Sequence, residues 1–140
     1  MNVLFVCTGN ACRSQMAEGF LRHMRGGRLN VDSAGLEAHG QNPRALQVMD
    51  EVGVGIQDQQ SSTLTEAHLV WADLVVTVCG DADEFCPMLP PGTDKHHWAL
   101  PDPARAQGDD ATVMTEFRRV RDDIEQRVQA LLKAIDGGEL

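Results

Sequence analysis

The chain has 140 residues, of which 42% are hydrophobic, so we expect a single domain over 1–140 with a core of its own. Its net charge of −9 and its pI near 4.8 argue against nucleic acids and anionic membranes as partners. It has neither an apolar run of about 20 residues nor a leader pattern, so we expect a cytoplasmic protein whose four cysteines are catalytic, redox-active or metal-binding.

Apolar runs and helical periodicity predict strands and helices that alternate along the chain. In chain order they are a strand at 3–6, a helix at 14–24, a strand at 29–31, a helix at 43–52, a helix at 66–71, a strand at 74–78, a loop region at 79–94, a strand at 97–100 and a helix at 112–135. Asn42 is a suitable cap for the second helix. The last helix is amphipathic throughout, which predicts a cover for the core.

This alternation predicts an α/β fold, a single-domain parallel sheet flanked by helices on both faces. In such folds, ligands bind at the carboxyl ends of the strands. Three segments with reactive side chains follow predicted strands: 7–13 after the first strand, Cys79 after the strand at 74–78, and Asp102 after the last. We therefore expect them to meet at one edge of the sheet.

The loop after the first strand has the features of an oxyanion site. Small residues let consecutive backbone N–H groups point inward, and the start of a helix adds unpaired N–H donors. A guanidinium can hold two oxygens of a tetrahedral oxyanion. The expected oxyanion-binding residues are Thr8, Gly9, Asn10, Ala11, Cys12, Arg13 and Ser14. The loop matches neither a Walker A motif nor a dinucleotide-binding fingerprint.

Cys7 is the expected nucleophile, because the same loop should lower the pKa of its thiol and Ser14 can donate a hydrogen bond to it. The alternative is a buried structural Cys7 with Arg13 in a surface ion pair. We expect Cys12 to pack beneath the loop as a small hydrophobe and to take no part in redox chemistry.

Further along the chain, Cys79 and Cys86 lie seven residues apart. A straight helix would separate their Cα atoms by about 10 Å, whereas a disulfide needs less than about 7 Å. We therefore predict that this segment rearranges on oxidation. The alternatives are that Cys79 belongs to the core, or that the two cysteines bind zinc with His96 and His97.

Asp102 stands between two prolines, which favours a stiff, extended backbone suited to a general acid. The alternative role is an Asp-Pro turn. His39, His96, His97 and Trp98 are expected to serve packing or loop hydrogen bonds rather than catalysis.

The stretch VLFVCTGNACRSQMAEG resembles the active-site loop of the low-molecular-weight protein tyrosine phosphatase superfamily. Within that superfamily, five colinear stretches resemble the thioredoxin-coupled arsenate reductases: CTGN-CRSQMAEG, DSAGLEAHGQNP, DLVVTVCGDADEFCP, HWALPDPA and EFRRVRDDIEQRV. The resemblance covers nearly the whole chain and implies the fold and activity of that family.

The resemblance implies that Cys7 attacks arsenate held by the loop amides and Arg13, with Asp102 supplying a proton. Cys79 then attacks Cys7, arsenite leaves, and Cys86 moves the disulfide to the pair Cys79–Cys86. Thioredoxin reduces that pair; the alternative reductant is a low-molecular-weight thiol with a glutaredoxin-like protein. We expect a monomer.

Some members of this family hold potassium near the loop with an Asn, a Glu, a Ser and an Asp. Asn10, Glu18 and Ser33 match the first three positions, but the fourth falls on Ser62. A neutral serine is a weak ligand for a hard cation. We therefore expect no cofactor and no metal, and potassium stays open as the alternative.

Two other functions remain open on the sequence. A phosphatase would use the same loop, because phosphate and arsenate are tetrahedral oxyanions of similar size, and residual hydrolysis of aryl phosphates is expected. The chain has no tyrosine, however, and Asp102-Pro103 is followed by Ala104-Arg105 rather than by aromatic residues. A non-enzymatic thiol protein, such as a sensor or a metal-binding module, would need neither Arg13 nor Asp102.

Overall fold

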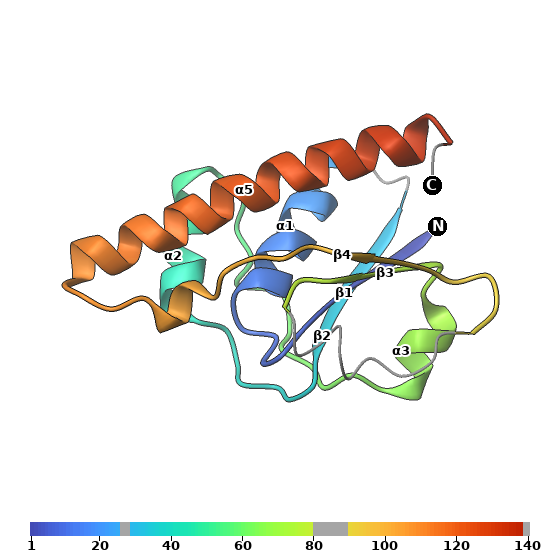
Figure 1. Ribbon diagram of the computed structural model, residues 1–140, viewed down its shortest axis with the longest axis horizontal. Helices are drawn as coiled ribbons and strands as arrows, with labels where there is room; N and C mark the ends of the chain where they lie inside the picture. The colour runs from blue at the N-terminus through green and yellow to red at the C-terminus, as the bar shows by residue number, and fades with distance from the viewer. Residues whose placement is uncertain (26–28, 80–89, 139–140) are drawn as a thin grey trace.

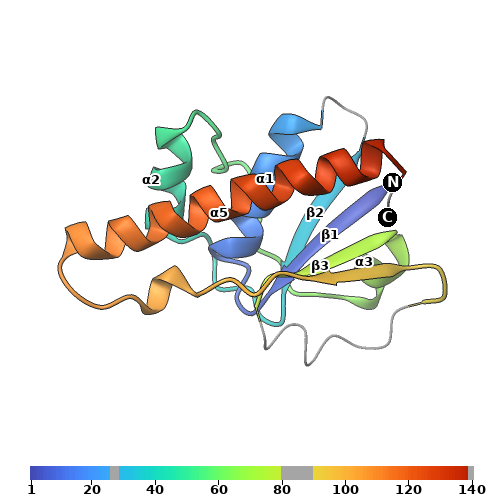
Figure 2. The same ribbon diagram turned by 45° about the horizontal axis from the view of Figure 1, so that its top comes forward.

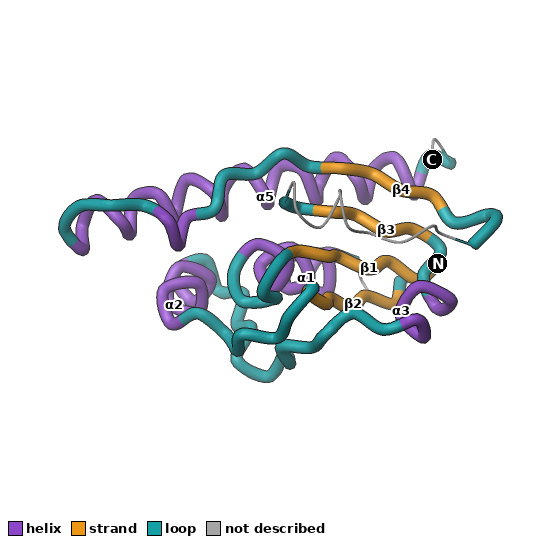
Figure 3. Tube along the Cα trace, turned by 60° about the horizontal axis from the view of Figure 1, so that its bottom comes forward, coloured by secondary structure: helices purple, strands orange, loops and turns teal. Residues whose placement is uncertain are grey.

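Four parallel strands form one sheet in the order β2-β1-β3-β4 (Figure 3). The structure, a computed structural model, describes residues 1–25, 29–79 and 90–138. The strands are β1 (Asn2–Cys7), β2 (Asn30–Gly35), β3 (Leu74–Thr77) and β4 (Asp94–His97). The two central strands, β1 and β3, are almost entirely buried, which explains why both read as continuous apolar runs.

Helices lie on both faces of the sheet, as predicted (Figures 1 and 3). They are α1 (Arg13–Met24), α2 (Pro43–Glu51), α3 (Glu66–Trp71), the 3₁₀ turn η1 (Pro103–Arg105) and α5 (Asp110–Asp136). On one face, α5 crosses α1 and reaches α2, while α3 lies on the other (Figure 2). In the described part of the chain, no helix combines the length and the apolar character of a membrane span.

The long helix α5 covers the core, as its periodicity predicted. Its buried residues recur every three or four positions: Val113, Phe117, Val120, Ile124, Val128 and Leu131. Asn42 caps α2 by accepting a hydrogen bond from the Arg44 amide, which also matches the prediction. Most predicted bounds lie within two residues of the observed ones, which is the usual uncertainty at frayed ends.

The predicted strand at 97–100 is wrong, because the strand is β4 at Asp94–His97. Within the described residues, β4 is an edge strand that pairs with β3 alone. Its side chains are mostly exposed, so it carries no apolar pattern. Trp98 and Leu100 are buried in the loop that follows, where the Trp98 ring packs 5.6 Å from the ring of Phe5. The apolar residues thus mark a buried loop.

The strand predicted at 29–31 is longer than expected and runs to Gly35 as β2. Asp32 and Ser33 interrupt its apolar pattern, although Ser33 is fully buried. This strand and β3 flank β1 on opposite sides, so the strand order reverses at β1. The loop after β1 therefore opens at the switch point where α/β folds bind ligands.

Two arginines of α5 hold the end of α2. Glu51 accepts hydrogen bonds from the Arg118 guanidinium, the shortest at 2.8 Å, and from Arg121 at 2.8 Å. The hydrogen bond from Arg118, together with Arg121, lowers the pKa of Glu51 from 4.5 to about 2. The ionised carboxylate is therefore favoured in the folded state over the unfolded state.

Replacing Glu51 with Gln should lower the denaturant midpoint of unfolding at neutral pH. The depressed pKa means that the contribution is present above pH 4.5 and disappears as the pH falls toward 2. Urea unfolding of both proteins across this range should show a difference that narrows with acid. A constant difference would mean that the charge of Glu51 has no part in it.

Candidate active site

The loop between β1 and α1 is held along one side by the segment 36–42. Backbone amides of this segment donate to four loop carbonyls at distances of 2.9 to 3.1 Å: Leu36 to Cys7, Glu37 to Thr8, His39 to Gly9 and Asn42 to Ala11. Those carbonyl oxygens therefore point toward the segment 36–42. Among the loop amides, that of Asn10 donates to the Cys7 sulfur, and the inward orientation of the others stays a prediction.

Cys7 ends β1 and is buried, with 3% of its surface exposed. Its Sγ lies 2.8 Å from the Ser14 Oγ and accepts a hydrogen bond of 3.2 Å from the Asn10 amide. Asn10 has a positive φ of 49°, a conformation that asparagine tolerates better than most residues. The turn at Asn10 thus aims a backbone donor at the sulfur.

Arg13 is buried, which argues against the surface ion pair considered as an alternative. Its guanidinium donates to the carbonyls of Leu100 at 3.0 Å and Val78 at 3.4 Å. Its other terminal nitrogen lies 3.7 Å from the Asp102 carboxylate. Both carbonyls come from segments at the carboxyl edge of the sheet, so this edge orients the guanidinium.

Asp102 has the extended backbone that its flanking prolines predicted. One carboxylate oxygen accepts from the Ala104 amide at 3.0 Å and caps η1, while the other lies 3.7 Å from Arg13 and from Arg105. Asp102 therefore occupies a turn and also borders the cleft. The two roles weighed for it on the sequence are compatible.

A cleft of about 680 Å³ brings most of the predicted residues together. Its lining includes Cys7 and Arg13 from the two ends of the loop after β1, together with Cys79 and Asp102 from two segments far along the chain. The Cys79 Sγ lies 3.1 Å from the hydroxyl of Thr8, the residue next to Cys7. Cys86 and the predicted rearrangement fall in 80–89, outside the described residues.

Cys12 is buried and lies in the same loop as Cys7. Burial, with the negative charges of Asp102 and Cys7, raises the pKa of its thiol to about 12, against a smaller opposing effect of Arg13. The thiol is therefore protonated at neutral pH and is a poor nucleophile. This chemistry agrees with its predicted role as a packed hydrophobe.

The zinc alternative finds no support in the described residues. Within 1–25, 29–79 and 90–138, no three His, Cys, Asp or Glu side chains gather as a metal site would require; Cys86 lies outside these ranges. His97 instead hydrogen-bonds Thr77 at 2.8 Å, in keeping with a structural role.

His39 lies against Gly9, where an added Cβ would come within 2.3 Å of its ring, in keeping with the packing role expected for it. One feature of the site was not predicted from the sequence. Asn10 and Glu18 are buried in a polar network behind the loop, with 0% and 2% of their surfaces exposed. Their positions followed from a resemblance to a potassium site, and no pattern in the sequence predicts the hydrogen bonds they make.

Comparison with known proteins places this geometry in context. The pattern of the low molecular weight phosphotyrosine protein phosphatase family matches residues 2–138. An arsenate reductase of Bacillus subtilis (strain 168) is 50% identical over 127 residues, or 91% of each chain. An arsenate reductase solved in its phosphate-binding state is 36% identical with a TM-score of 0.77, covering 96% of this chain and 98% of its own.

A thioredoxin-dependent arsenate reductase of Corynebacterium glutamicum is also similar in structure. It is 33% identical with a TM-score of 0.79, and the match covers 98% of this chain and 62% of that one. The sheet and its flanking helices are therefore shared with proteins of this kind.

Gly35 allows the close approach between β2 and the loop. A Cβ there would lie 2.5 Å from the Glu37 carbonyl oxygen, 2.7 Å from the Asn10 amide and 2.8 Å from the Thr8 carbonyl oxygen. Gly35→Ala should therefore cost about 1–3 kcal/mol of stability and slow the alkylation of Cys7, because the Asn10 amide must move. Unfolding by urea and iodoacetamide labelling measure the two effects.

Gly53→Ala is the matched control, because Gly53 has a φ of 76° and nothing within 4 Å of an added Cβ. It should lose stability through backbone strain without slowing Cys7 labelling. Equal labelling of the wild type and Gly35→Ala would contradict the prediction.

Proposed function

The chain belongs to the low molecular weight phosphotyrosine protein phosphatase family, and on this premise we propose that it reduces arsenate to arsenite with thioredoxin as reductant. The observation that carries the proposal is the position of Cys79, a second thiol on the cleft that holds Cys7 and Arg13. Hydrolysis of a phosphate ester needs one nucleophile, whereas reduction of arsenate also needs two electrons from thiols. The names of the relatives support the same activity.

In the first step, arsenate is held by the loop amides and the Arg13 guanidinium. The Cys7 thiolate attacks arsenic, and an oxygen leaves as water after Asp102 supplies a proton. The product is a thioester of arsenic in which the metalloid is still pentavalent. Ser14 and the Asn10 amide, both within hydrogen-bond distance of the sulfur, stabilise the thiolate before attack.

In the second step, the Cys79 thiolate attacks the Cys7 sulfur. The sulfur–arsenic bond breaks, its electron pair goes to arsenic, and arsenite leaves as a Cys7–Cys79 disulfide forms. Cys86 then attacks Cys79, restores the Cys7 thiolate, and leaves a Cys79–Cys86 disulfide for the two thiols of thioredoxin to reduce. Two electrons pass from thioredoxin to each arsenate.

A residual phosphatase activity is expected from the same anion-binding loop. Cys7, Arg13 and Asp102 would suffice to cleave a small aryl phosphate with a good leaving group. Among the described residues that line the cleft, none is Phe, Tyr or Trp, so nothing there would stack on a phosphotyrosine ring. We therefore propose arsenate as the main substrate and aryl phosphates as poor ones.

The relay is tested by following NADPH consumption with arsenate, thioredoxin and thioredoxin reductase. Cys79→Ser and Cys86→Ser should each fall to background, because each interrupts the transfer of the disulfide. Both variants should still hydrolyse p-nitrophenyl phosphate, because that reaction needs Cys7, Arg13 and Asp102 but neither Cys79 nor Cys86. Cys12→Ser is the matched control and should keep turnover, since that thiol is protonated in the fold. Turnover by Cys79→Ser would contradict the relay.

A substitution at Arg13 distinguishes the proposed enzyme from a thiol protein that only senses or stores arsenic. Arg13→Lys keeps the charge but loses the planar pair of donors, so kcat/KM for arsenate should fall by about 10²-fold or more, comparable to the loss of one oxyanion donor. Steady-state kinetics measure the effect. An unchanged kcat/KM would favour the non-enzymatic alternative.

A further inference from the structure

A buried ionic pair lies behind the loop, between α1 and β2. The Arg22 Nε donates to one oxygen of Glu18 at 2.7 Å, one helical turn away, and its terminal nitrogen donates to the Val31 carbonyl at 2.9 Å. The other Glu18 oxygen accepts from the Ser33 hydroxyl at 2.5 Å. The Glu18 side chain is only 3% exposed, whereas that of Arg22 is 44% exposed. The pair therefore joins a surface cation to a buried carboxylate.

From Ser33 the hydrogen bonds continue to the nucleophile. The Asn10 side-chain nitrogen donates one hydrogen to the Ser33 hydroxyl at 2.9 Å and the other to the Ser14 hydroxyl at 2.8 Å. Ser14 in turn lies 2.8 Å from the Cys7 sulfur. The chain of contacts from Arg22 to the thiol is thus continuous.

The orientation of the Asn10 amide is fixed from its other side. Its oxygen accepts from the Ser62 backbone amide at 2.8 Å and from the Gln15 side-chain nitrogen at 3.2 Å. A backbone amide can only donate, so the atom facing Ser62 must be the oxygen. The nitrogen therefore faces the two serines, as the contacts above require.

These constraints set the donor and the acceptor of every hydrogen bond between Glu18 and Cys7. A carboxylate can only accept a hydrogen bond, so Ser33 must donate its hydroxyl hydrogen to Glu18. The Ser33 oxygen then accepts from Asn10, and the Ser14 oxygen does the same. The Ser14 hydroxyl hydrogen is left to point at Cys7, where it stabilises a thiolate.

The same contacts decide how well these residues fit potassium. Both oxygens of Glu18, the side-chain oxygen of Asn10 and the hydroxyl of Ser33 already have hydrogen-bond partners within the protein. Ser62 contributes a backbone donor to Asn10, which a cation would repel. The residues do not fit a cation in this arrangement, and Arg22 supplies the positive charge.

We propose that Arg22 is a positioning residue for the reaction: its guanidinium is the built-in cation that keeps Glu18 a hydrogen-bond acceptor and so directs the Ser14 hydroxyl at Cys7. Without Arg22, the buried carboxylate of Glu18 loses the charged donor that holds one of its oxygens, and its position against Ser33 is no longer fixed. The Ser33 hydroxyl hydrogen can then turn to another acceptor, and the direction of this chain of hydrogen bonds is lost. The inference rests on the proposed function only for the role of Cys7 as nucleophile.

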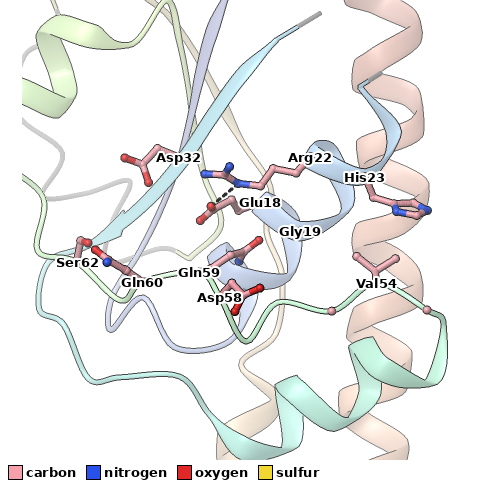
Figure 4. Close-up of a pocket in the computed structure, with 12 residues that line it drawn as sticks. Glu18, Gly19, Arg22, His23, Asp32, Val54, Asp58, Gln59, Gln60 and Ser62 are labelled. Carbon is pink, nitrogen blue, oxygen red and sulfur yellow. Dashed lines mark hydrogen bonds and ion pairs between the residues drawn. The ribbon is translucent and has the colours of Figure 1, made fainter. Parts of the chain in front are cut away.

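A cleft beside this pair gives the proposal a direct test. It has a volume of about 570 Å³ and is lined by Glu18, Arg22, Asp32 and Asp58 among others (Figure 4). Figure 4 shows Arg22 reaching across to Glu18 at the border of this space. A small cation from solvent could therefore replace the guanidinium once the Arg22 side chain is shortened.

The experiment measures carboxamidomethylation of Cys7 by iodoacetamide at neutral pH. Tandem mass spectrometry separates Cys7 from Cys12, which share one tryptic peptide. In Arg22→Ala the rate should fall about tenfold, the effect of losing about 1.4 kcal/mol of thiolate stabilisation. Millimolar guanidinium chloride should restore most of the rate, and Arg22→Lys should retain most of it. In arsenate reduction, kcat should fall while KM stays nearly constant.

Glu18→Gln is the second variant, since its amide would donate to Ser33 and so reverse the hydrogen bond that Ser33 donates in the native protein. Its Cys7 rate should fall as in Arg22→Ala, but guanidinium should not restore it. Arg127→Ala is the matched control, because Arg127 pairs with Asp123 at 2.9 Å with the same spacing on α5. It should leave the rate unchanged.

Three results would overturn the inference: an unchanged Cys7 rate in folded Arg22→Ala, an equal loss in Arg127→Ala, or a loss in Arg22→Ala that guanidinium does not restore. Potassium gives a further readout. Compared with sodium at equal ionic strength, potassium should not accelerate the alkylation of Cys7 in the wild type. A strong acceleration would also overturn the inference. Alkylation needs no arsenate, so failure of the proposed function would leave this result intact.

Discussion

The pairing of the loop after β1 with the segment 36–42 is the constraint on which the rest of the site depends. Four loop carbonyls are satisfied by amides from one side, so the backbone has little freedom to turn them toward the cleft. Gly35 makes the approach possible, because backbone atoms occupy the place of its missing side chain. The anion binding proposed for this loop would thus depend on backbone direction first and on side chains second.

Strand order determines which distant groups reach the loop. Because β1 lies between β2 and β3, its carboxyl end receives segments from both halves of the chain. Val78 and Leu100 provide the carbonyls that orient Arg13, and Cys79 arrives one residue after Val78. A parallel sheet therefore assembles a cleft from residues that share no local pattern.

The sequence predicts this cleft well because the cleft residues follow the ends of strands, and buried apolar runs mark where those strands end. The prediction failed at β4, where an edge strand of exposed polar residues carries no such mark and the buried Trp98 lies beyond it. It also could not supply the network behind the loop. Asn10, Gln15 and Glu18 are polar residues that a pattern assigns to the surface, yet all three are buried. Their partners come from β2 and the segment before α3, and only the folded chain brings them together.

The protonated state of Cys12 has a consequence for how the product would leave. Trivalent arsenic is thiophilic and is held most firmly where neighbouring thiolates can share it. Cys12 lies five positions from the nucleophile, close enough in sequence to offer a second ligand, but a pKa of about 12 keeps it a thiol. The loop would thus present one sulfur ligand at a time to arsenic. Burial of the Cys12 side chain would thus withhold from the product a thiolate close to the nucleophile.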